Sequence, residues 1–298
     1  MGRLRIIVLG AAGRLGAALA REYSRSHDVL AWGRREADLG EPGAVAESIH
    51  ASGADIIINT AALTNVDVCE EQRELARRVN ADAPALIAEA SQAIGARCIH
   101  ISTDYVFSGR IERPYAENDA PEPLSWYGAT KLAGEQGVLA AGDRHAVVRV
   151  AWVFGPDRDC FVDKALHMAL RGDAVSAVAD KFSSPTYTLD AASALRGLFS
   201  AAVQGGIYHL CQRGACSWQQ WAQEAIDAAA DLGVPVRTRK VAPMRLAELK
   251  LMTAPRPVNT AMSCARLEAV NGQPMRLWPV AVRDYVRLLR DAGRLSTA

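Results

Sequence analysis

Residues 4–16, LRIIVLGAAGRLG, decide the fold of this chain. The apolar run at 4–9 is typical of a strand that is buried on both faces of a sheet. It leads through three glycines, Gly10, Gly13 and Gly16, into an Ala- and Leu-rich helical pattern that continues to about Ser24. A buried strand, a glycine-rich turn and a helix, in that order, predict the opening of a nucleotide-binding βαβ unit.

The glycines indicate what the turn binds. Glycine lets the backbone turn sharply and lets a pyrophosphate approach the helix N-terminus, where free N–H groups and the helix dipole favour negative charge. The spacing is GxxGxxG rather than the usual GxGxxG, and a glycine triplet alone can be a simple turn. Its position at the first strand–helix junction favours the nucleotide. We therefore expect a dinucleotide to be held by Gly10, Gly13, Arg14, Leu15 and Gly16.

Four further apolar runs, at 28–32, 55–59, 97–102 and 146–152, continue the pattern. Helical stretches separate them at 42–52, at 69–96 with an interruption at Pro84, and at 127–141. Strands that alternate with helices predict an α/β fold with a parallel, doubly wound, Rossmann-like sheet. The Pro- and acid-rich segment 108–125 is predicted to be a long irregular loop, and loops of this length inside a domain are usually functional.

The second half is less regular. We predict strands at 206–210 and 234–241 and helices at 218–231 and 279–292. This suggests a dinucleotide-binding domain at 1–150, with a later segment near 185–205 packing back on it, and a smaller, mainly substrate-binding domain at 151–298. The crevice between them is the expected site.

Composition narrows the class of protein. Among 298 residues, 34 Lys and Arg balance 33 Asp and Glu, so the formal net charge is +1. Such a balance gives no general attraction to nucleic acid or to an anionic membrane. No apolar run approaches the ~20 residues that span a bilayer, and the N-terminus lacks signal-peptide features. Six scattered cysteines without a CxxC pair fit a reducing cytoplasm better than a zinc site.

The end of the second strand selects the cofactor. A carboxylate there would bind the ribose 2′-hydroxyl of NAD, but residues 33–35 contain none. Arg34 and Arg35 stand where a 2′-phosphate would lie, so we expect NADPH, with NADH as the alternative donor and a solvated basic loop as the alternative structure. Asp38 and Leu39 follow, where they can contact the adenine.

Two segments carry catalytic chemistry. Thr103 ends the fourth strand, at the sheet edge where ligands bind. Tyr127 and Lys131 are spaced i, i+4 and therefore share one helix face. A nearby ammonium stabilises a phenolate and lowers the phenol pKa from about 10, which makes the phenol a usable proton donor and acceptor near neutrality. A YxxxK spacing alone is often an exposed pair, but the glycine turn and the hydroxyl of Thr103 favour catalysis.

Together these features resemble the extended short-chain dehydrogenase/reductase superfamily, and within it the dTDP-4-dehydrorhamnose reductase family. The resemblance covers nearly the whole chain. The segments that carry it are NTAALTNVD at 59–67, VNA at 79–81, STDYVF at 102–107, YGATK at 127–131, WVFG at 152–155, SPTY at 184–187 and RPVNT at 256–260.

The resemblance implies roles for individual residues. Tyr127 would protonate the C4 ketone oxygen of a nucleotide-linked 6-deoxy sugar, Thr103 would hydrogen-bond that oxygen, and Lys131 would hold the nicotinamide ribose and tune Tyr127. The family further implies cofactor contacts by Ala61, Ala62 and Asn80, and substrate contacts by Thr64, Val66 and Trp152. It allows a homodimer, and we predict no metal site.

Several positions leave alternatives open. Asp104 is a second substrate contact or a structural cap. Arg256 suits a diphosphate or a surface ion pair. Lys181 stands in a segment, 180–184, that departs from the family pattern, and it either serves a diphosphate or is a solvated charge. His100, in an apolar strand, is expected to be a satisfied buried histidine rather than a base.

Two other functions compete with the reductase. A related nucleotide-sugar 4-ketoreductase or epimerase would use the same Tyr and Lys. A non-catalytic, NADP-binding regulatory subunit would share the fold, but it would be favoured by a broken catalytic set, whereas Thr103, Tyr127 and Lys131 are all present.

Overall fold

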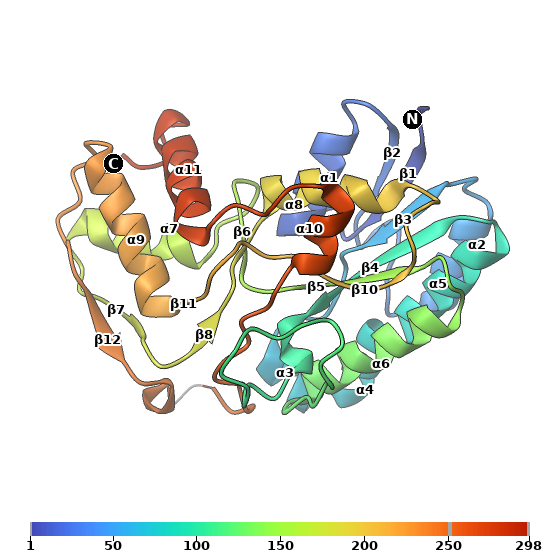
Figure 1. Cartoon of the computed structure of the whole chain (residues 1–298), viewed down its shortest axis with the longest axis horizontal. Coiled ribbons are helices and arrows are strands. Elements are labelled where there is room, and N and C mark those ends of the chain that lie inside the picture. Colours follow the sequence, from blue (N-terminus) through green and yellow to red (C-terminus); the bar gives the residue numbers. More distant parts are fainter. Residues whose placement is uncertain (1, 250–251, 297–298) are drawn as a thin grey trace.

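The computed structural model describes residues 2–249 and 252–296, and a six-stranded parallel sheet lies at its centre (Figure 1). The spatial order is β10-β5-β4-β3-β1-β2, and every neighbouring pair is parallel. This confirms the predicted α/β class. The strands are β1 (Arg5–Leu9), β2 (Asp28–Trp32), β3 (Ile56–Asn59), β4 (Arg97–Thr103), β5 (Ala146–Val150) and β10 (Gly206–His209).

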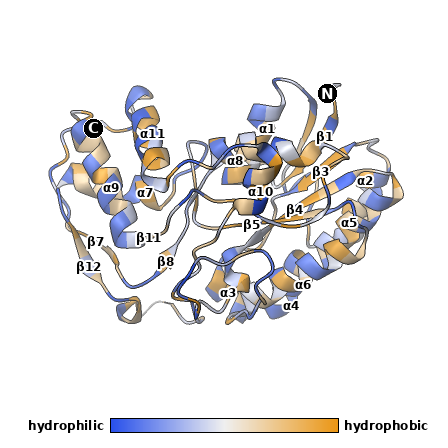
Figure 2. Ribbon diagram, in the orientation of Figure 1, coloured by the Kyte–Doolittle hydropathy of each residue, from blue (hydrophilic) through white to orange (hydrophobic). Residues whose placement is uncertain are grey.

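Helices cover both faces of the sheet, which is why its strands are rich in apolar residues on both faces (Figure 2). Ile6 and Val8 of β1 pack on one face with α1 and α8, whereas Ile7 and Leu9 pack on the other with α2, α5 and α6. Helix α10 covers β10 on the α8 side. These helices are α1 (Arg14–Tyr23), α2 (Pro42–His50), α5 (Ala83–Ala93), α6 (Trp126–Ala140), α8 (Thr188–Leu195) and α10 (Ala265–Asn271).

The strand order changes direction at β1, which pairs with β2 on one side and with β3 on the other. Chain connections leave the sheet in opposite directions at this point, so a crevice opens beyond the carboxyl ends of the strands. In open parallel sheets such a switch point is where ligands bind. The glycine-rich turn after β1 lies there, as the sequence predicted.

A second group of helices packs at the other end of the molecule (Figure 1). Their shared core combines aliphatic side chains with the aromatic rings of Phe154, Tyr187, Trp221 and Tyr285. The elements here are α7 (Phe161–Arg171), α9 (Trp218–Asp231) and α11 (Trp278–Asp291), the parallel pair β7 (Val175–Val178) and β12 (Val241–Met244), and the short strands β6 (Val153–Phe154), β8 (Phe182–Ser183), β9 (Thr186–Tyr187) and β11 (Cys216–Ser217).

The chain passes between these two parts more than once. After β9 it returns to the sheet, where α8 packs on α1 and β10 pairs with β5. It then leaves for α9 and comes back once more as α10. The division into a 1–150 and a 151–298 domain stays a prediction.

Two sequence predictions of secondary structure were wrong. The helical stretch predicted at 69–96, with one interruption at Pro84, is four segments, α3 (Val66–Glu71), α4 (Arg73–Arg77), a π-helical turn (Arg78–Asp82) and α5. Pro84 lies in the first turn of α5, directly after the π-helical turn, so the change in helix type falls just before it. The strand predicted at 234–241 is irregular, and β12 begins only at Val241, where it finds β7 as a partner.

Short 3-10 turns complete the chain at Asp104–Val106, Arg196–Phe199 and Leu246–Glu248. The loop predicted at 108–125 is irregular, with one isolated bridge from Tyr115 to Met262. Across residues 2–249 and 252–296, no helix combines the length and the apolar character that a membrane crossing requires.

Candidate active site

A cavity of about 1200 Å³ opens at the carboxyl edge of the sheet. Every strand from β1 to β5 contributes to its wall through the residues at or just after its end. It runs from the glycine-rich turn, past the end of β4, to Trp152 beyond β5. This single space therefore joins the predicted cofactor residues to the predicted catalytic residues.

The glycine-rich turn has no room for a side chain at Gly10 or at Gly16. Gly10 has φ +76°, and a Cβ placed on it would lie 2.8 Å from the backbone nitrogen of Ala61. A Cβ on Gly16 would lie 2.3 Å from the carbonyl oxygen of Gly10. Gly13 precedes α1 as its N-cap without a side-chain partner, so the first N–H groups of the helix face the cavity. The turn therefore fits a pyrophosphate, which needs close backbone approach and free N–H donors.

The basic end of the cavity lies after β2. Arg34 lines it, and its Nε lies 3.2 Å from Asp38 Oδ2 in an exposed pair. Asp38 and Leu39 line the same end, whereas Arg35 does not line the cavity. Of the two arginines that the sequence proposed for a 2′-phosphate, only Arg34 is placed at the cavity wall.

Tyr127 and Thr103 meet at the middle of the cavity, from α6 and from the end of β4. Ser125 caps α6 by accepting a hydrogen bond from Gly128 N, which fixes the turn that carries Tyr127. A Cβ on Gly128 would lie 2.3 Å from the carbonyl oxygen of Tyr105, so only glycine lets α6 approach the end of β4 this closely. The hydroxyl of Thr103 donates to Asp104 Oδ1 at 3.2 Å.

The pKa of Tyr127 departs from our expectation. Burial raises the pKa of its phenol, and the Thr103 hydroxyl offsets this only in part. The sequence predicted a pKa lowered by Lys131, and that was wrong for this structure, because the ammonium group of Lys131 makes its contacts elsewhere. A phenol that keeps its proton is suited to donate it, which is the direction that a ketone reduction requires.

Lys131 lines the cavity with only 1% of its surface exposed. Its Nζ donates to the carbonyl oxygen of Ile101 at 2.7 Å and lies 3.0 Å from His100 Nε2. Burial lowers the pKa of Lys131 from 10.5 to about 8. The residue thus changes charge close to physiological pH.

The hydrogen bonds around His100 fix its tautomer. Ala61 N donates to Asn59 Oδ1 at 3.1 Å, so the amide nitrogen of Asn59 is the atom that faces His100 Nδ1 at 3.2 Å. Nδ1 must then accept, and the proton of a neutral imidazole lies on Nε2, facing Lys131. Burial and the neighbouring Lys131 both lower the pKa of His100, which keeps it neutral. His100 is the satisfied buried histidine that the sequence predicted.

Asn80 is hydrogen-bonded to the backbone of Leu63. It lies in the π-helical turn, and its side chain accepts from Leu63 N at 2.9 Å and donates to Leu63 O at 3.0 Å. These two hydrogen bonds position the segment that carries Thr64 and Val66, both of which line the cavity. Asn80 itself does not line it.

Trp152 forms the far wall and adopts an unusual backbone conformation. It is the one residue other than glycine with positive φ (+42°) among those the structure describes. Its ring stacks on Trp221 with centroids 5.6 Å apart and tilts against Trp218 at 5.9 Å. Such strain, held in place by packing, is typical of binding sites.

Asp104 belongs to a buried polar group behind the cavity. Its carboxylate accepts from Thr103, from Ser183 Oγ at 3.0 Å and from Thr260. Lys181, fully buried, donates to the carbonyl oxygen of Pro257 and lies over the ring of Tyr105. The solvated alternative for Lys181 was therefore wrong, and Asp104 serves as a structural anchor that also borders the cavity.

Arg256 is occupied by a protein partner. It forms a bidentate ion pair with Asp67, in which Nη2 donates to Oδ2 at 2.6 Å and Nη1 to Oδ1 at 2.8 Å. Asp67 also accepts from the backbone nitrogens of Thr253 and Ala254 at 2.9 Å each. The diphosphate alternative fails in this structure, since Arg256 does not line the cavity. The ion-pair alternative holds, although the pair is mostly buried rather than on the surface.

Most predicted site residues come together. Four do not line the cavity, namely Gly16, Arg35, Asn80 and Arg256. Those that do are Gly10, Gly13, Arg14, Leu15, Arg34, Asp38, Leu39, Ala61, Ala62, Thr64, Val66, Thr103, Asp104, Tyr127, Lys131 and Trp152.

The sequence predicted no role for three polar residues that shape this site. Asn59 and Asp67 act through partners distant in sequence, His100 and Arg256. Arg158 borders the glycine-rich turn from the loop after β6. Asn59 and Asp67 lie in the segment 59–67 that carries the family resemblance, whereas the only local signal of Arg158 is its charge in the loop after β6.

Comparison with known proteins agrees with this geometry. Residues 4–290 match the family model described as RmlD substrate binding domain. The chain is 39% identical over 287 residues to the dTDP-4-dehydrorhamnose reductase of Mycolicibacterium smegmatis, covering 95% of this chain and 85% of that one. It is 38% identical over 286 residues to the Mycobacterium tuberculosis reductase of the same name, covering 93% and 91%.

A solved structure matches over nearly the whole chain. It is dTDP-4-dehydrorhamnose reductase from Bacillus anthracis in complex with NADP, with a TM-score of 0.88 and 30% identity. The match covers 96% of this chain and 99% of that one.

Proposed function

Because this chain belongs to the dTDP-4-dehydrorhamnose reductase family, we propose that it reduces the C4 ketone of dTDP-4-dehydrorhamnose with NADPH to give dTDP-L-rhamnose. It is an oxidoreductase of the NADP-dependent type. The observation that carries the proposal is one continuous cavity that joins a pyrophosphate cradle to a buried phenol.

The chain's own residues account for binding the cofactor. The turn at Gly10 and Gly13 leaves room for a pyrophosphate at the start of α1, and Arg34 supplies positive charge at the adenosine end. Ala61 and Ala62 line the cavity after β3, and their small side chains leave room for the cofactor between the glycine-rich turn and the proposed catalytic residues. NADPH, when bound, supplies the hydride that reduces the ketone carbon.

Tyr127 is the proposed general acid. Its buried phenol stays protonated at neutral pH, so it can give its proton to the ketone oxygen as that oxygen gains negative charge. Thr103 lies beside it and can donate to the same oxygen by giving up a long, 3.2 Å bond to Asp104. Lys131, in its charged form, has N–H groups to spare for ribose hydroxyls.

The sugar is proposed to lie between Tyr127 and Trp152. Thr64 and Val66, held by Asn80 through Leu63, form the side of this space. The deoxy carbon and ring faces of a 6-deoxy sugar are apolar, and an aromatic wall suits them. All six cysteines are buried free thiols, and they support the cytoplasmic location that we propose.

A direct assay tests the proposal. Purified protein is mixed with NADPH and dTDP-4-dehydrorhamnose, and the absorbance of the reduced nicotinamide is followed. Oxidation of one NADPH per sugar, lost in Tyr127→Phe, supports the reductase. Bound NADPH without oxidation would instead favour a regulatory subunit or another keto-sugar, and sugar conversion without net oxidation would favour an epimerase.

A further inference from the structure

The loop between β6 and α7 carries an alternating run, Asp157, Arg158 and Asp159, that borders the glycine-rich turn. All three residues line the cavity together with Gly10, although they belong to the half of the chain that follows the sheet's fifth strand. A loop at this position faces whatever occupies the turn.

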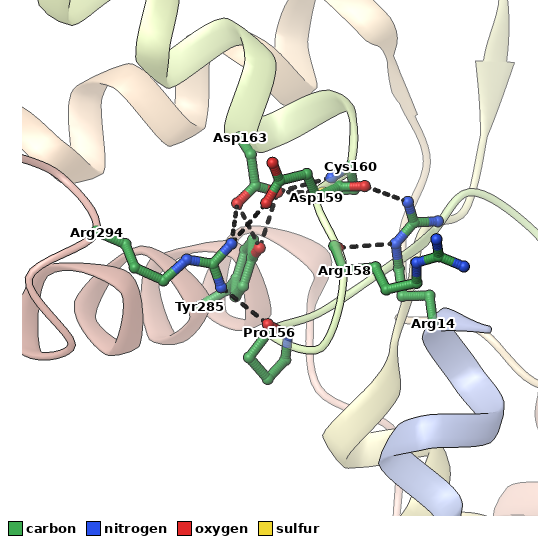
Figure 3. Close-up of polar contacts among 8 residues, drawn as sticks. All are labelled: Arg14, Pro156, Arg158, Asp159, Cys160, Asp163, Tyr285 and Arg294. Carbon is green, nitrogen blue, oxygen red and sulfur yellow. Dashed lines mark hydrogen bonds and ion pairs between the residues drawn. The ribbon is translucent and has the colours of Figure 1, made fainter. Parts of the chain in front are cut away.

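The two acidic residues of the run are neutralised by arginines outside it. Asp157 forms an ion pair with Arg21 of α1. Asp159 Oδ1 accepts from Arg294 Nη2 at 2.7 Å, just beyond α11. Arg294 also donates to the carbonyl oxygen of Pro156 at 2.8 Å, so one guanidinium fixes both ends of the loop (Figure 3).

Arg14, which the sequence assigned to the cofactor, holds the same loop from the other side. Its Nε donates to Arg158 O at 3.2 Å, its Nη1 to Val153 O at 3.2 Å and its Nη2 to Asp159 O at 2.5 Å. Figure 3 shows the loop secured between Arg14 and Arg294. The donors of Arg14 are thus directed at backbone oxygens rather than into the cavity.

Arg158 is the third charged residue of the run, and no ion pair among the described residues neutralises its charge. Its Nη1 donates to Ala12 O at 3.0 Å, which places the guanidinium directly at the glycine-rich turn. Within residues 2–249 and 252–296, no carboxylate lies at ion-pair distance from it. The side chain is exposed to the cavity, and an arginine has five N–H donors, of which this bond uses one.

We propose that Arg158 binds the pyrophosphate of the dinucleotide, as a cation that the substrate half of the chain supplies to the cofactor half. The inference rests on the proposed function, because it takes the cavity to hold a dinucleotide. A planar guanidinium with free parallel N–H groups matches phosphate oxygens. The N-terminus of α1 favours the same anion, so the pyrophosphate would be held between the start of this helix and the guanidinium of Arg158.

This role has a signature that separates it from the role of Arg34. The pyrophosphate is common to NADPH, NADH and ADP-ribose, whereas the 2′-phosphate belongs to NADPH alone. Loss of a charge-assisted contact at Arg158 therefore weakens all three ligands by a similar factor, about tenfold or more. Loss of a 2′-phosphate contact weakens NADPH only.

The experiment measures dissociation constants of these three ligands by calorimetry, without sugar, for the wild type and for Arg158→Gln, Arg158→Lys and Arg171→Ala. Gln keeps a donor for Ala12 O but removes the charge, Lys keeps the charge, and Arg171 is an exposed arginine paired with Asp173 at the end of α7. We expect Arg158→Gln to bind each ligand about tenfold more weakly than the wild type and Arg158→Lys to lose less affinity. Arg171→Ala should bind all three as the wild type does. Thermal unfolding of each variant checks that the fold is kept.

Two results would overturn the inference. If Arg158→Gln binds all three ligands as tightly as the wild type, Arg158 only ties the loop to Ala12. If it weakens NADPH alone, Arg158 contacts the 2′-phosphate instead. A wild type that binds none of the three would refute the proposed function itself, so the two failures are distinguishable.

Discussion

The side-chain nitrogen of Lys131 lies 3.0 Å from Nε2 of His100, and the hydrogen bonds of Asn59 direct the imidazole proton toward it. Both side chains are buried, and an N–H that faces an amine favours the neutral amine over the ammonium. The relationship ties the charge of Lys131, whose catalytic role is proposed above, to a histidine that does not line the cavity.

The first prediction concerns pH. Burial lowers the pKa of Lys131 to about 8, and the charged form is the one that can donate to ribose hydroxyls. Turnover with NADPH should therefore fall as the pH rises through about 8. In His100→Gln an amide oxygen can accept from the ammonium, so this decline should move to higher pH. His50→Gln, at an exposed position on α2, is the matched control, and pH profiles of kcat/KM give the answer.

Tyr127→Phe should keep NADPH binding nearly intact and cut turnover by about 10² to 10⁴, the range that general acid catalysis supplies. Tyr208→Phe is the control. It removes a hydroxyl on β10 that donates a hydrogen bond to the carbonyl oxygen of Gln204, and it should leave turnover unchanged. Turnover numbers and NADPH dissociation constants are measured for both. A Tyr127→Phe enzyme as fast as the wild type would remove this residue from its role.

Gly16→Ala should abolish dinucleotide binding, although Gly16 does not line the cavity. The added Cβ would lie 2.3 Å from Gly10 O and push the turn out of shape. Gly43→Ala is the matched control, because nothing lies within 4 Å of a Cβ there. Calorimetric titration with NADPH compares the two, and equal affinity would show that the turn tolerates side chains.

Arg34→Ala should weaken NADPH about tenfold and leave NADH nearly unchanged, because only NADPH carries the 2′-phosphate. Arg35→Ala should have a much smaller effect, since Arg35 does not line the cavity. Steady-state KM values for both nucleotides measure this. A similar loss for NADPH and NADH in Arg34→Ala would contradict the assignment.

Breaking the Asp67–Arg256 pair should destabilise the fold and loosen the segment at 253–256. The cost expected for Arg256→Met is about 2 kcal/mol, because it leaves a mostly buried carboxylate without its charged partner. Arg256 holds the pKa of Asp67 well below its usual range, so this stabilisation is present above the unfolded pKa of about 3.9 and is lost as the pH falls further.

Urea unfolding at neutral pH measures that cost. A double-mutant cycle with Asp67→Asn should show a coupling energy of about 1 to 2 kcal/mol. Strictly additive effects of the two substitutions would mean that the pair contributes nothing of its own.

The sheet could be predicted because its signals are local. Buried parallel strands are continuous apolar runs, so β1, β2 and β10 were located to within a residue at each end. The π-helical turn at 78–82 and the start of β12 depend on tertiary partners, the packing of α6 and the pairing with β7. Neither leaves a periodic pattern in the sequence.

The same distinction holds for the site. Gly10 and Tyr127 carry their chemistry in short motifs, and both line the cavity. The two alternatives for Arg256 could not be decided from the sequence, because its partner, Asp67, is 189 residues away in the chain. The raised pKa of Tyr127 follows from burial, which spacing along a helix does not indicate.

The most direct test of the central claim follows the hydride itself. The protein is incubated with dTDP-4-dehydrorhamnose and NADPH that carries deuterium at both hydrogen positions of nicotinamide C4, so that transfer from either face is detected, and the sugar product is examined by NMR. We predict dTDP-L-rhamnose with deuterium at C4 of the sugar and none when the label is in the solvent. Label at C4 from solvent, or a product without deuterium, would contradict a direct transfer from the cofactor to the ketone carbon.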